Sequence, residues 1–432
     1  MKRQKSKWQI PFFTIWSGQA FSLLGSRVVQ FALVWWLTEL TGSATVLATA
    51  TMVALIPEVL LSPIAGAYVD RWNRRVVMIV ADGMIALASV WLAYLFWADA
   101  IQVWHVYVIM VVRAVGGCFH WPAMQASTSL MVPKRHLTRV TGLNQTLNGA
   151  LNIVGPPLGA LLMGMLSLHH VILVDVGTAM LAILLLLFVH VPQPTRTGES
   201  EARKASVWTD LRAGLRYIRG WPGLMVLMGA AMIFKIALTP AFSLLPLLVS
   251  DHFRGGANQL SLLESVVGVG ILIGGLILSV WGGFRRKIYT SLAGIIVLSL
   301  GLAVLGLTPA GRFEMALVSM FVVGLMIPFI DGPIMAIFQG TIAPEMQGRV
   351  LTLVSSLLWI TSPFSLAIAG PVTDWLGIQV WYVTAGVLCG LTGLAGFFMP
   401  AIVNIEQNHG GRSAVEREAR EATTVPVRVE VE

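Results

Sequence analysis

The sequence predicts an all-α integral membrane protein with twelve transmembrane helices in two pseudo-symmetric halves of six. Three observations support this fold class. The 432-residue chain is 56% hydrophobic, and only 12% of its residues are Asp, Glu, Lys or Arg, about half of the roughly 25% usual in globular proteins. Its apolar residues fall in twelve runs, and about 20 residues suffice to cross a bilayer. Prolines and basic pairs recur at a constant offset of 211 residues.

The twelve runs follow one another with short polar segments between them. The first six lie at about 12–38, 44–69, 76–98, 103–126, 138–165 and 169–190. The second six lie at about 222–249, 260–283, 288–308, 313–338, 346–371 and 380–401. The first run is too long for a cleaved signal peptide and no small-residue cleavage site follows it, so we expect it to be retained as the first helix.

The constant offset indicates two copies of one unit. The matching positions are Arg74-Arg75 with Arg285-Arg286, Pro122 with Pro333, and Pro133 with Pro344. Six helices in each copy would start both copies on the same side of the membrane, which makes the repeat parallel. Parallel repeats of this size are found in secondary transporters. The copies are not identical, because Trp281 stands where the first copy has Asp70, and Gly324 where it has Arg113.

The net charge of +8 reflects membrane topology and not binding to nucleic acid. If the amino terminus is cytoplasmic, 24 of the 29 Lys and Arg residues lie in predicted inside segments. Two lie outside, and Arg27, Arg113 and Lys235 lie within apolar runs. Under the positive-inside rule this bias places both termini in the cytoplasm. We therefore expect a multi-pass protein of a bacterial cytoplasmic membrane, surrounded by lipid and without a nucleic acid partner.

Four regions follow from this pattern: an amino-terminal half (1–191), a linker (192–221), a carboxy-terminal half (222–402) and a tail (403–432). In the linker, apolar residues recur at helical spacing between Trp208 and Arg219. This periodicity predicts an amphipathic helix along the inner membrane face, with a solvated linker helix as the alternative. The tail has many charges and few large apolar residues, so we expect it to be disordered.

A charged loop separates the second and third runs. It contains Gly66, Asp70, Arg71, Arg74 and Arg75. An acid and several bases at this place can pair with the other half and with helix ends, whose partial charges attract opposite ions. We therefore interpret the loop as a gate. The alternative is a positive-inside anchor, which needs only bases and explains neither Gly66 nor Asp70.

Charged residues inside the apolar runs are candidates for the transport site. Each costs roughly 2.5–3.5 kcal/mol on insertion scales. Arg27, Glu58 and Arg113 have similar predicted depths near the bilayer middle. We interpret them as a proton-coupling or substrate-binding cluster, and the alternative is a permanent ion pair. Asp331 is expected either to contact a cationic substrate or to bond at a helix kink.

Two weaker candidates accompany these residues. Lys235 lies in the seventh run and Asp175 in the sixth, about five residues from its outer end. Because that end is close, the Asp175 side chain can reach the water outside the membrane, which would account for its charge.

The fifth run carries two further features. Gly149, Gly155, Pro156 and Gly159 bring small surfaces and a missing backbone donor into a helix, which favours a bend and a close neighbour. We expect these residues to seal the interface between the halves, with generic helix packing as the alternative. A polar stripe is expected either to line a central cavity or to bond to other helices; it comprises Asn144, Gln145, Asn148 and Asn152.

These motifs resemble the major facilitator superfamily. The 66–75 loop resembles the family signature between helices two and three, although Asn73 replaces the usual glycine; Asn tolerates turn conformations, so we expect the loop to form. The fifth run resembles the antiporter signature, and Arg113 with Gly116-Gly117 resembles the helix-four arginine motif. The stretch 30–45 resembles macrolide-efflux and enterobactin-exporter relatives.

The resemblance implies a transporter that exports amphipathic small molecules of the drug or macrolide type, in exchange for protons and by alternating access. It further implies that the 66–75 loop holds the outward-open state and that a monomer is functional. Siderophore export, proton-linked import and a membrane scaffold or receptor remain as alternatives. We expect no enzyme, cofactor or metal site, because no nucleophile constellation, metal-ligand spacing or phosphate-binding loop is found.

Overall fold

The computed structural model describes residues 8–69, 71–189, 191–193 and 207–407. All regular secondary structure in these residues is helical. Eleven helices in the described part of the chain are long and apolar enough to cross a membrane. Large apolar side chains face outward from them, including Leu87, Phe188 and Val280, which are 73%, 80% and 89% exposed. Apolar surface of this extent needs a non-aqueous surrounding, and the chain is a multi-pass membrane protein.

Six long helices form the first half. They are α1 (Gln9–Thr41), α2 (Ala44–Val69), α3 (Arg74–Trp97), α4 (Val103–Met131), α5 (Leu137–Met165) and α6 (Leu168–Phe188). A short 3₁₀ turn (Lys134–His136) precedes α5. Gly42 ends α1 with a φ of 54°, a left-handed conformation that glycine adopts at little cost, so α1 and α2 form a tight helical hairpin.

The second half repeats this order with one irregularity. Its first helix, α8 (Pro222–Ser243), continues through α9 (Leu245–Leu247) into a π-helical turn, η3 (Leu248–His252). The remaining helices are α10 (Ala257–Trp281), α11 (Lys287–Leu307), α12 (Phe313–Thr341), α13 (Pro344–Leu376), α14 (Ile378–Phe398) and the short α15 (Pro400–Val403). The helices at equivalent positions α4 and α12 each have 29 residues, and α6 and α14 each have 21.

Eleven of the twelve predicted runs form helices that are long and apolar enough to cross a membrane. The exception is α5, a 29-residue helix at the place of the fifth run, which is not among the eleven spans. Its amino-terminal half carries Arg139 and a stripe of amide side chains, which lower its hydropathy. The crossing by α5 therefore stays a prediction.

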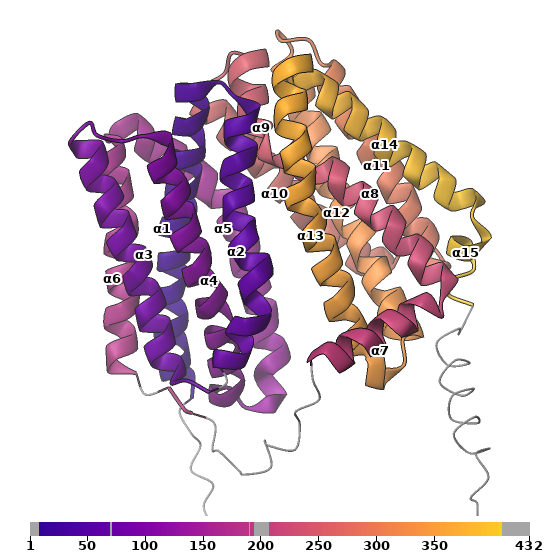
Figure 1. Cartoon of the computed structure of the whole chain (residues 1–432), viewed down its shortest axis with the longest axis horizontal. Coiled ribbons are helices and arrows are strands. Elements are labelled where there is room, and N and C mark those ends of the chain that lie inside the picture. The colour runs from indigo at the N-terminus through magenta and orange to yellow at the C-terminus, as the bar shows by residue number, and fades with distance from the viewer. Residues whose placement is uncertain (1–7, 70, 190, 194–206, 408–432) are drawn as a thin grey trace, which may run out of the picture.

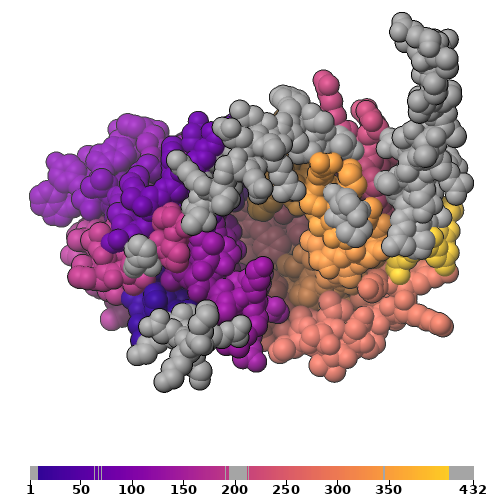
Figure 2. Space-filling model, turned by 90° about the horizontal axis from the view of Figure 1, so that it is seen from below, coloured from indigo at the N-terminus to yellow at the C-terminus, as the bar shows by residue number. Residues whose placement is uncertain are grey.

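Figure 1 shows the two groups of helices side by side, α1–α6 in indigo to magenta and α8–α15 in pink to yellow. We call the end with Arg71–Arg75, Arg285–Lys287 and the linker helix the basic end, and the end with Gly42 and Gly377 the opposite end. Direct packing between the groups runs mainly through α2 with α13 and α5 with α10. Seen from the basic end, the surface is hollowed between the groups (Figure 2).

The predicted linker helix is present as α7 (Val207–Arg219). Tyr217 and Ile218 are buried in a cluster with Leu353 of α13 and Leu224 of α8. The apolar face at the end of α7 is therefore covered by the second half of the protein. Tyr217 and Ile218 contact protein there, and not lipid or water.

The start of the tail is packed. Ile405 is fully buried, and Glu406 Oε1 accepts a hydrogen bond of 2.8 Å from the backbone N–H of Ile288 at the start of α11. A carboxylate at a helix amino terminus satisfies otherwise unpaired donors. The prediction of disorder from residue 403 is therefore wrong for 403–407. Residues 408–432 lie outside the described residues.

Candidate functional site

The described part of the 66–75 loop ties helix ends of the first half together. Arg74 is buried and donates from Nη1 to the carbonyl of Ala126 near the end of α4, at 2.8 Å. Arg75 donates to the carbonyl of Leu187 at the end of α6. Cations are favoured at such carbonyl ends. Arg71 is exposed, and a Cβ on Gly66 would meet nothing within 4 Å. Asp70 lies outside the described residues, so its gating role stays a proposal.

Asn73 fits the loop for a reason other than the expected turn. Its φ of −68° and ψ of 108° are extended, and its side chain accepts hydrogen bonds from the backbone N–H groups of Arg75 and Val76. It is thus the N-cap of α3, a position that Asn occupies readily. The second copy differs, because Gly282 and Gly283 turn there with φ of 76° and 83°.

Arg113 belongs to a buried network inside the first half. It forms an ion pair with Asp175, and its Nη1 lies 3.1 Å from Ser89 Oγ. Ser89 and Ser26 each donate to the Asp175 carboxylate at 3.0 Å. Asp175 is 1% exposed, so the expectation that it snorkels to water is wrong. The network joins α1, α3, α4 and α6, and the coupling role predicted for Arg113 stays a proposal.

We predict a large loss of stability from Asp175→Asn. Removing one charge leaves Arg113 buried without its counterion, which costs about 3–5 kcal/mol. The midpoint of thermal unfolding in detergent should fall clearly. The double variant Arg113→Met, Asp175→Leu should recover most of the loss, because an apolar pair of similar volume is often neutral. An unchanged midpoint for Asp175→Asn would show that the pair is not structural.

A cavity of about 370 Å³ lies where the two halves meet. The first half contributes α1, α2 and α5, and the second contributes α8, α9 and α10. Most of the wall is apolar. The apolar lining residues are Phe31, Val34, Pro156, Phe242, Leu245, Pro246, Leu260, Val267, Gly268 and Ile271. The polar lining residues are Arg27, Gln30, Thr51, Asn152, Ser243 and Glu264.

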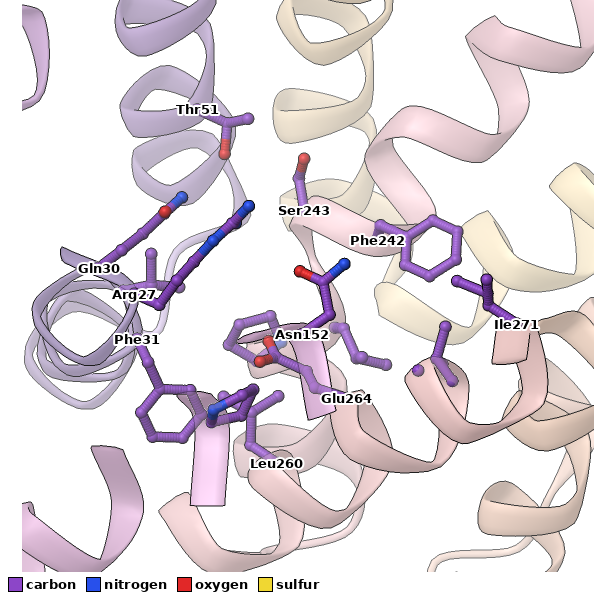
Figure 3. Close-up of a pocket in the computed structure, with 16 residues that line it drawn as sticks. Arg27, Gln30, Phe31, Thr51, Asn152, Phe242, Ser243, Leu260, Glu264 and Ile271 are labelled. Carbon is purple, nitrogen blue, oxygen red and sulfur yellow. The ribbon is translucent and has the colours of Figure 1, made fainter. Parts of the chain in front are cut away.

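Arg27 and Glu264 are the two charged residues of this lining. Arg27 comes from α1 and Glu264 from α10 of the other half. Figure 3 shows Arg27 extending toward Thr51 and Ser243, with Glu264 below it on the α10 side. Opposite charges that line one cavity attract each other. The cavity thus holds one base and one acid, each carried by a different half.

The structure does not bring Arg27, Glu58 and Arg113 together as the sequence predicted. Arg113 pairs with Asp175, and Arg27 lines the central cavity together with Glu264. Glu58 is exposed, forms no ion pair with a described residue and does not line the cavity. Equal depth along three helices does not fix the direction in which their side chains point, and these three point into different surroundings.

A second pair of charges lies in the second half. Asp331 of α12 is exposed and interacts electrostatically with Lys235 of α8. The Lys235 ammonium lies 5.0 Å from the ring centroid of Trp359 on α13, within the range of a cation–π contact. Neither charge lines the central cavity. The role of Asp331 in contacting a cationic substrate stays a proposal.

Two of the four small residues predicted to seal the halves, Gly155 and Gly159, pack against α1 of their own half. A Cβ on Gly155 would lie 3.1 Å from Arg27 Cβ, and one on Gly159 would lie 2.8 Å from the Phe31 ring. Both glycines therefore give room to cavity residues of α1. A Cβ on Gly149 would meet nothing within 4 Å. The side of α5 that faces α10 includes Ile153, which lies next to Gly268. Gly149 and Pro156 lie four and three residues from Ile153 and therefore share its face, so their role as a seal between the halves stays a prediction.

The polar stripe on α5 divides between the two expected roles. Asn144 accepts a hydrogen bond of 2.9 Å from Trp16 Nε1 on α1, whereas Asn152 and Pro156 line the cavity. Asn148 lies between Asn144 and Asn152 on the same stripe and is half-buried.

The sequence analysis did not include Glu264 among the candidate site residues, although the sequence contains an indication of it. It is the sole charged residue of the α10 sequence, and the cost of a charge at membrane depth applies to it as it does to Arg27. Asp82 was missed as well. It is buried and lies 3.0 Å from Gln19 Nε2 and 3.5 Å from His120 Nε2. Among the described residues, no group of three or more His, Cys, Asp or Glu could hold a metal ion.

Known proteins resemble the chain in sequence and in fold. The model of the Major Facilitator Superfamily matches residues 15–356. Macrolide efflux protein A of Streptococcus pyogenes is 33% identical over 384 residues, which are 89% of this chain and 94% of that protein. The multidrug efflux pump Tap of Mycolicibacterium fortuitum is 27% identical over 399 residues, which are 88% of this chain and 94% of the pump.

Two solved structures have the same fold. The nucleoside transporter NupG has a TM-score of 0.63 and 14% identity, covering 88% of this chain and 97% of its own. A bacterial homologue of the iron transporter ferroportin, in its inward-facing state, has a TM-score of 0.64 and 14% identity, covering 90% and 98%. The family match spans most of the sequence, and the efflux proteins align over nearly their full length. The chain belongs to the major facilitator superfamily.

Proposed function

We propose that the protein exports amphipathic small molecules of the macrolide or multidrug type in exchange for protons, by alternating access to the central cavity. The observation that carries this proposal is the position of that cavity. Both halves build it, it is mostly apolar, and each half contributes one charge of opposite sign. A volume of about 370 Å³ falls within the roughly 300–1,000 Å³ typical of small-molecule sites.

The lining suits an amphipathic molecule. Apolar side chains from both halves can cover a hydrophobic body, and burial contributes about 25 cal/mol for each Å² of apolar surface removed from water. Gln30, Thr51, Asn152 and Ser243 provide hydrogen-bonding groups. The names of the similar proteins, a macrolide efflux protein and a multidrug efflux pump, support the same class of substrate.

Glu264 provides a way to couple export to protons. Its carboxylate can bind a proton or the ammonium group of a cationic substrate, but not both at once. A substrate released on the acidic side of the membrane is then replaced by a proton, which leaves Glu264 on the other side before the next substrate binds. Arg27 supplies a counterion to the carboxylate when neither is bound. This exclusive binding makes the exchange one substrate for one proton.

The two ends of the molecule differ in a way that fits the inward-open state of an alternating-access cycle. The halves pack together at the opposite end through α2 and α13, and the surface is hollowed at the basic end (Figure 2). With the basic end in the cytoplasm, the cavity faces inward, ready to take up a substrate for export. Twelve crossings, cytoplasmic termini and a gating role for Asp70 and Arg71 in the outward-open state belong to this proposal.

The same charges bear on siderophore export. An anionic substrate would bind Arg27 and would bind best when Glu264 is protonated, because the negative carboxylate would repel it. Substrate and proton would then bind together, which produces co-transport and not exchange. The site therefore favours a cationic substrate for proton-driven export. Siderophore secretion and drug susceptibility of a deletion strain would separate these two functions.

The test of the proposed function is transport by the purified full-length protein in lipid vesicles. A radiolabelled macrolide with a tertiary amine should accumulate when the vesicle interior is acidic. Dissipating the pH gradient with an ionophore should release it, and vesicles without protein are the control. Accumulation that ignores the gradient would exclude proton exchange, and the absence of both accumulation and counterflow for macrolides and other cationic drugs would exclude this transport function.

A further inference from the structure

The opposite end of the molecule is held together by a carboxylate that crosses from one half to the other. Asp374, on the last turn of α13, caps the amino terminus of α2. The backbone N–H groups of Ala44 and Thr45 donate to its Oδ1 and Oδ2 at 2.6 and 3.0 Å. Ser43 Oγ donates to Oδ2 at 3.0 Å. Asp374 and Ala44 are 330 positions apart in the sequence.

This cap differs from an ordinary one, because the helix and its capping residue belong to different halves. The first N–H groups of a helix lack partners within the helix, and the helix dipole attracts a negative charge to them. The cap is usually a nearby Ser, Thr, Asp or Asn. Here Ser43 occupies the local position, where its Oγ accepts a 3.4 Å hydrogen bond from the Val46 N–H and donates its own hydrogen to Asp374 at 3.0 Å. The start of α2 is therefore bound most closely by the other half.

The packing beneath the cap is equally close. Gly370 precedes Asp374 by one helical turn, which places both on the same face of α13. A Cβ on Gly370 would lie 2.8 Å from the Cα of Thr45 and 3.1 Å from the Cβ of Ala48. The backbone of α13 thus lies directly against α2, and the Asp374 carboxylate reaches the α2 terminus without separating them.

We propose that Asp374 is the latch that holds the opposite end closed, and that its release from the α2 terminus opens this end during the cycle. The position suits a reversible contact, because Asp374 is exposed at the end of the molecule. When the halves separate, water can replace each lost hydrogen bond, so the contact can break without leaving buried groups unpaired. The inference rests on the proposed alternating access, but its test requires no substrate.

The test measures how often the opposite end opens. Leu366 is fully buried and lies two turns from Asp374 on the same face of α13, so Leu366→Cys reports opening by its reaction with a membrane-impermeant maleimide. The native Cys118 and Cys389 are both buried. Cysteine at Trp375, which is 84% exposed, gives the labelling rate of an accessible site. The full chain is used in lipid vesicles.

Adding Asp374→Ala should raise the labelling rate of the Leu366→Cys reporter about tenfold, which corresponds to about 1.4 kcal/mol in the equilibrium between closed and open states. Asp374→Asn should have a smaller effect, because its amide keeps one acceptor oxygen. Glu39→Gln removes an exposed acid that forms no bond across the halves, and it should leave the rate unchanged.

Equal labelling rates in Asp374→Ala, Glu39→Gln and the unaltered chain would overturn the proposal. Faster labelling in Asp374→Ala with an unchanged thermal unfolding midpoint supports it, and faster labelling with a lowered midpoint in both Asp374 variants indicates a folding role and contradicts it. Because labelling is measured without substrate, its result stands apart from the transport assay. A failure of proton exchange would leave the latch supported, and a failure of the latch would leave the exchange supported.

Discussion

Glu264→Gln is expected to abolish accumulation driven by the pH gradient while leaving exchange of substrate for substrate. Glutamine has nearly the same shape as glutamate and keeps hydrogen-bonding groups, but it cannot bind and release a proton. The cavity would still be formed by both halves and would still alternate between the two sides. What would be lost is the requirement that a proton replaces the substrate.

The size of the effect follows from the stoichiometry. A difference of one pH unit is worth about 1.4 kcal/mol for each proton, and this free energy corresponds to about a tenfold concentration ratio. One-for-one exchange of a monocation should therefore give about tenfold accumulation in the unaltered protein. In Glu264→Gln the ratio should fall to about one, and counterflow without a gradient should persist at a reduced rate, since the ammonium group loses its ionic partner.

Glu58→Gln is the matched control for this experiment, because Glu58 is also a glutamate within an apolar helix but does not line the cavity. It should retain gradient-driven accumulation. The opposite outcome, with loss in Glu58→Gln and none in Glu264→Gln, would move the coupling carboxylate to α2, as the sequence suggested. A neutral N-oxide of the same macrolide offers a second check, since its transport should respond little to Glu264→Gln.

The fold was predictable because it depends on properties that repeat along the chain. Bilayer thickness sets the length of each apolar run, and eleven of the twelve runs are helices of sufficient length and hydropathy. The remaining run is α5, a helix whose amides reduce its hydropathy, so its crossing stays a prediction. Hydropathy predicts a membrane crossing least well for a helix whose polar side chains face other helices or a cavity.

The site was predictable only in part, because its residues meet across the halves. The cost of a buried charge identified Arg27, but the choice of partner depends on the rotation of each helix about its axis. Depth alone suggested Glu58 and Arg113 as its neighbours. In the structure Arg113 pairs with Asp175, and Glu264 lines the same cavity as Arg27. The same reason applies to Gly155 and Gly159 of α5, which face α1.

The close approach of α2 and α13 leads to a second large expected effect. Gly370→Ala should trap the protein with its opposite end open. The new methyl group would lie 2.8 Å from the Cα of Thr45, a backbone atom that cannot rotate away. Because Thr45 belongs to the other half, the strain can be relieved by moving the halves apart. Overpacking costs about 1–3 kcal/mol, which shifts an equilibrium by roughly 5- to 150-fold.

Gly324→Ala provides the contrast, because its contact lies within one half. A Cβ there would clash with the Val267 carbonyl oxygen, where α12 packs against α10. No movement of the halves relieves that clash. Gly324→Ala should therefore lower the thermal unfolding midpoint, whereas Gly370→Ala should keep the midpoint, speed labelling of the Leu366→Cys reporter and slow transport by the same factor. If both variants were equally unstable and neither changed labelling, the α2–α13 contact would be ordinary packing. If Gly370→Ala alone changed labelling, this contact would be a joint that opens in each cycle.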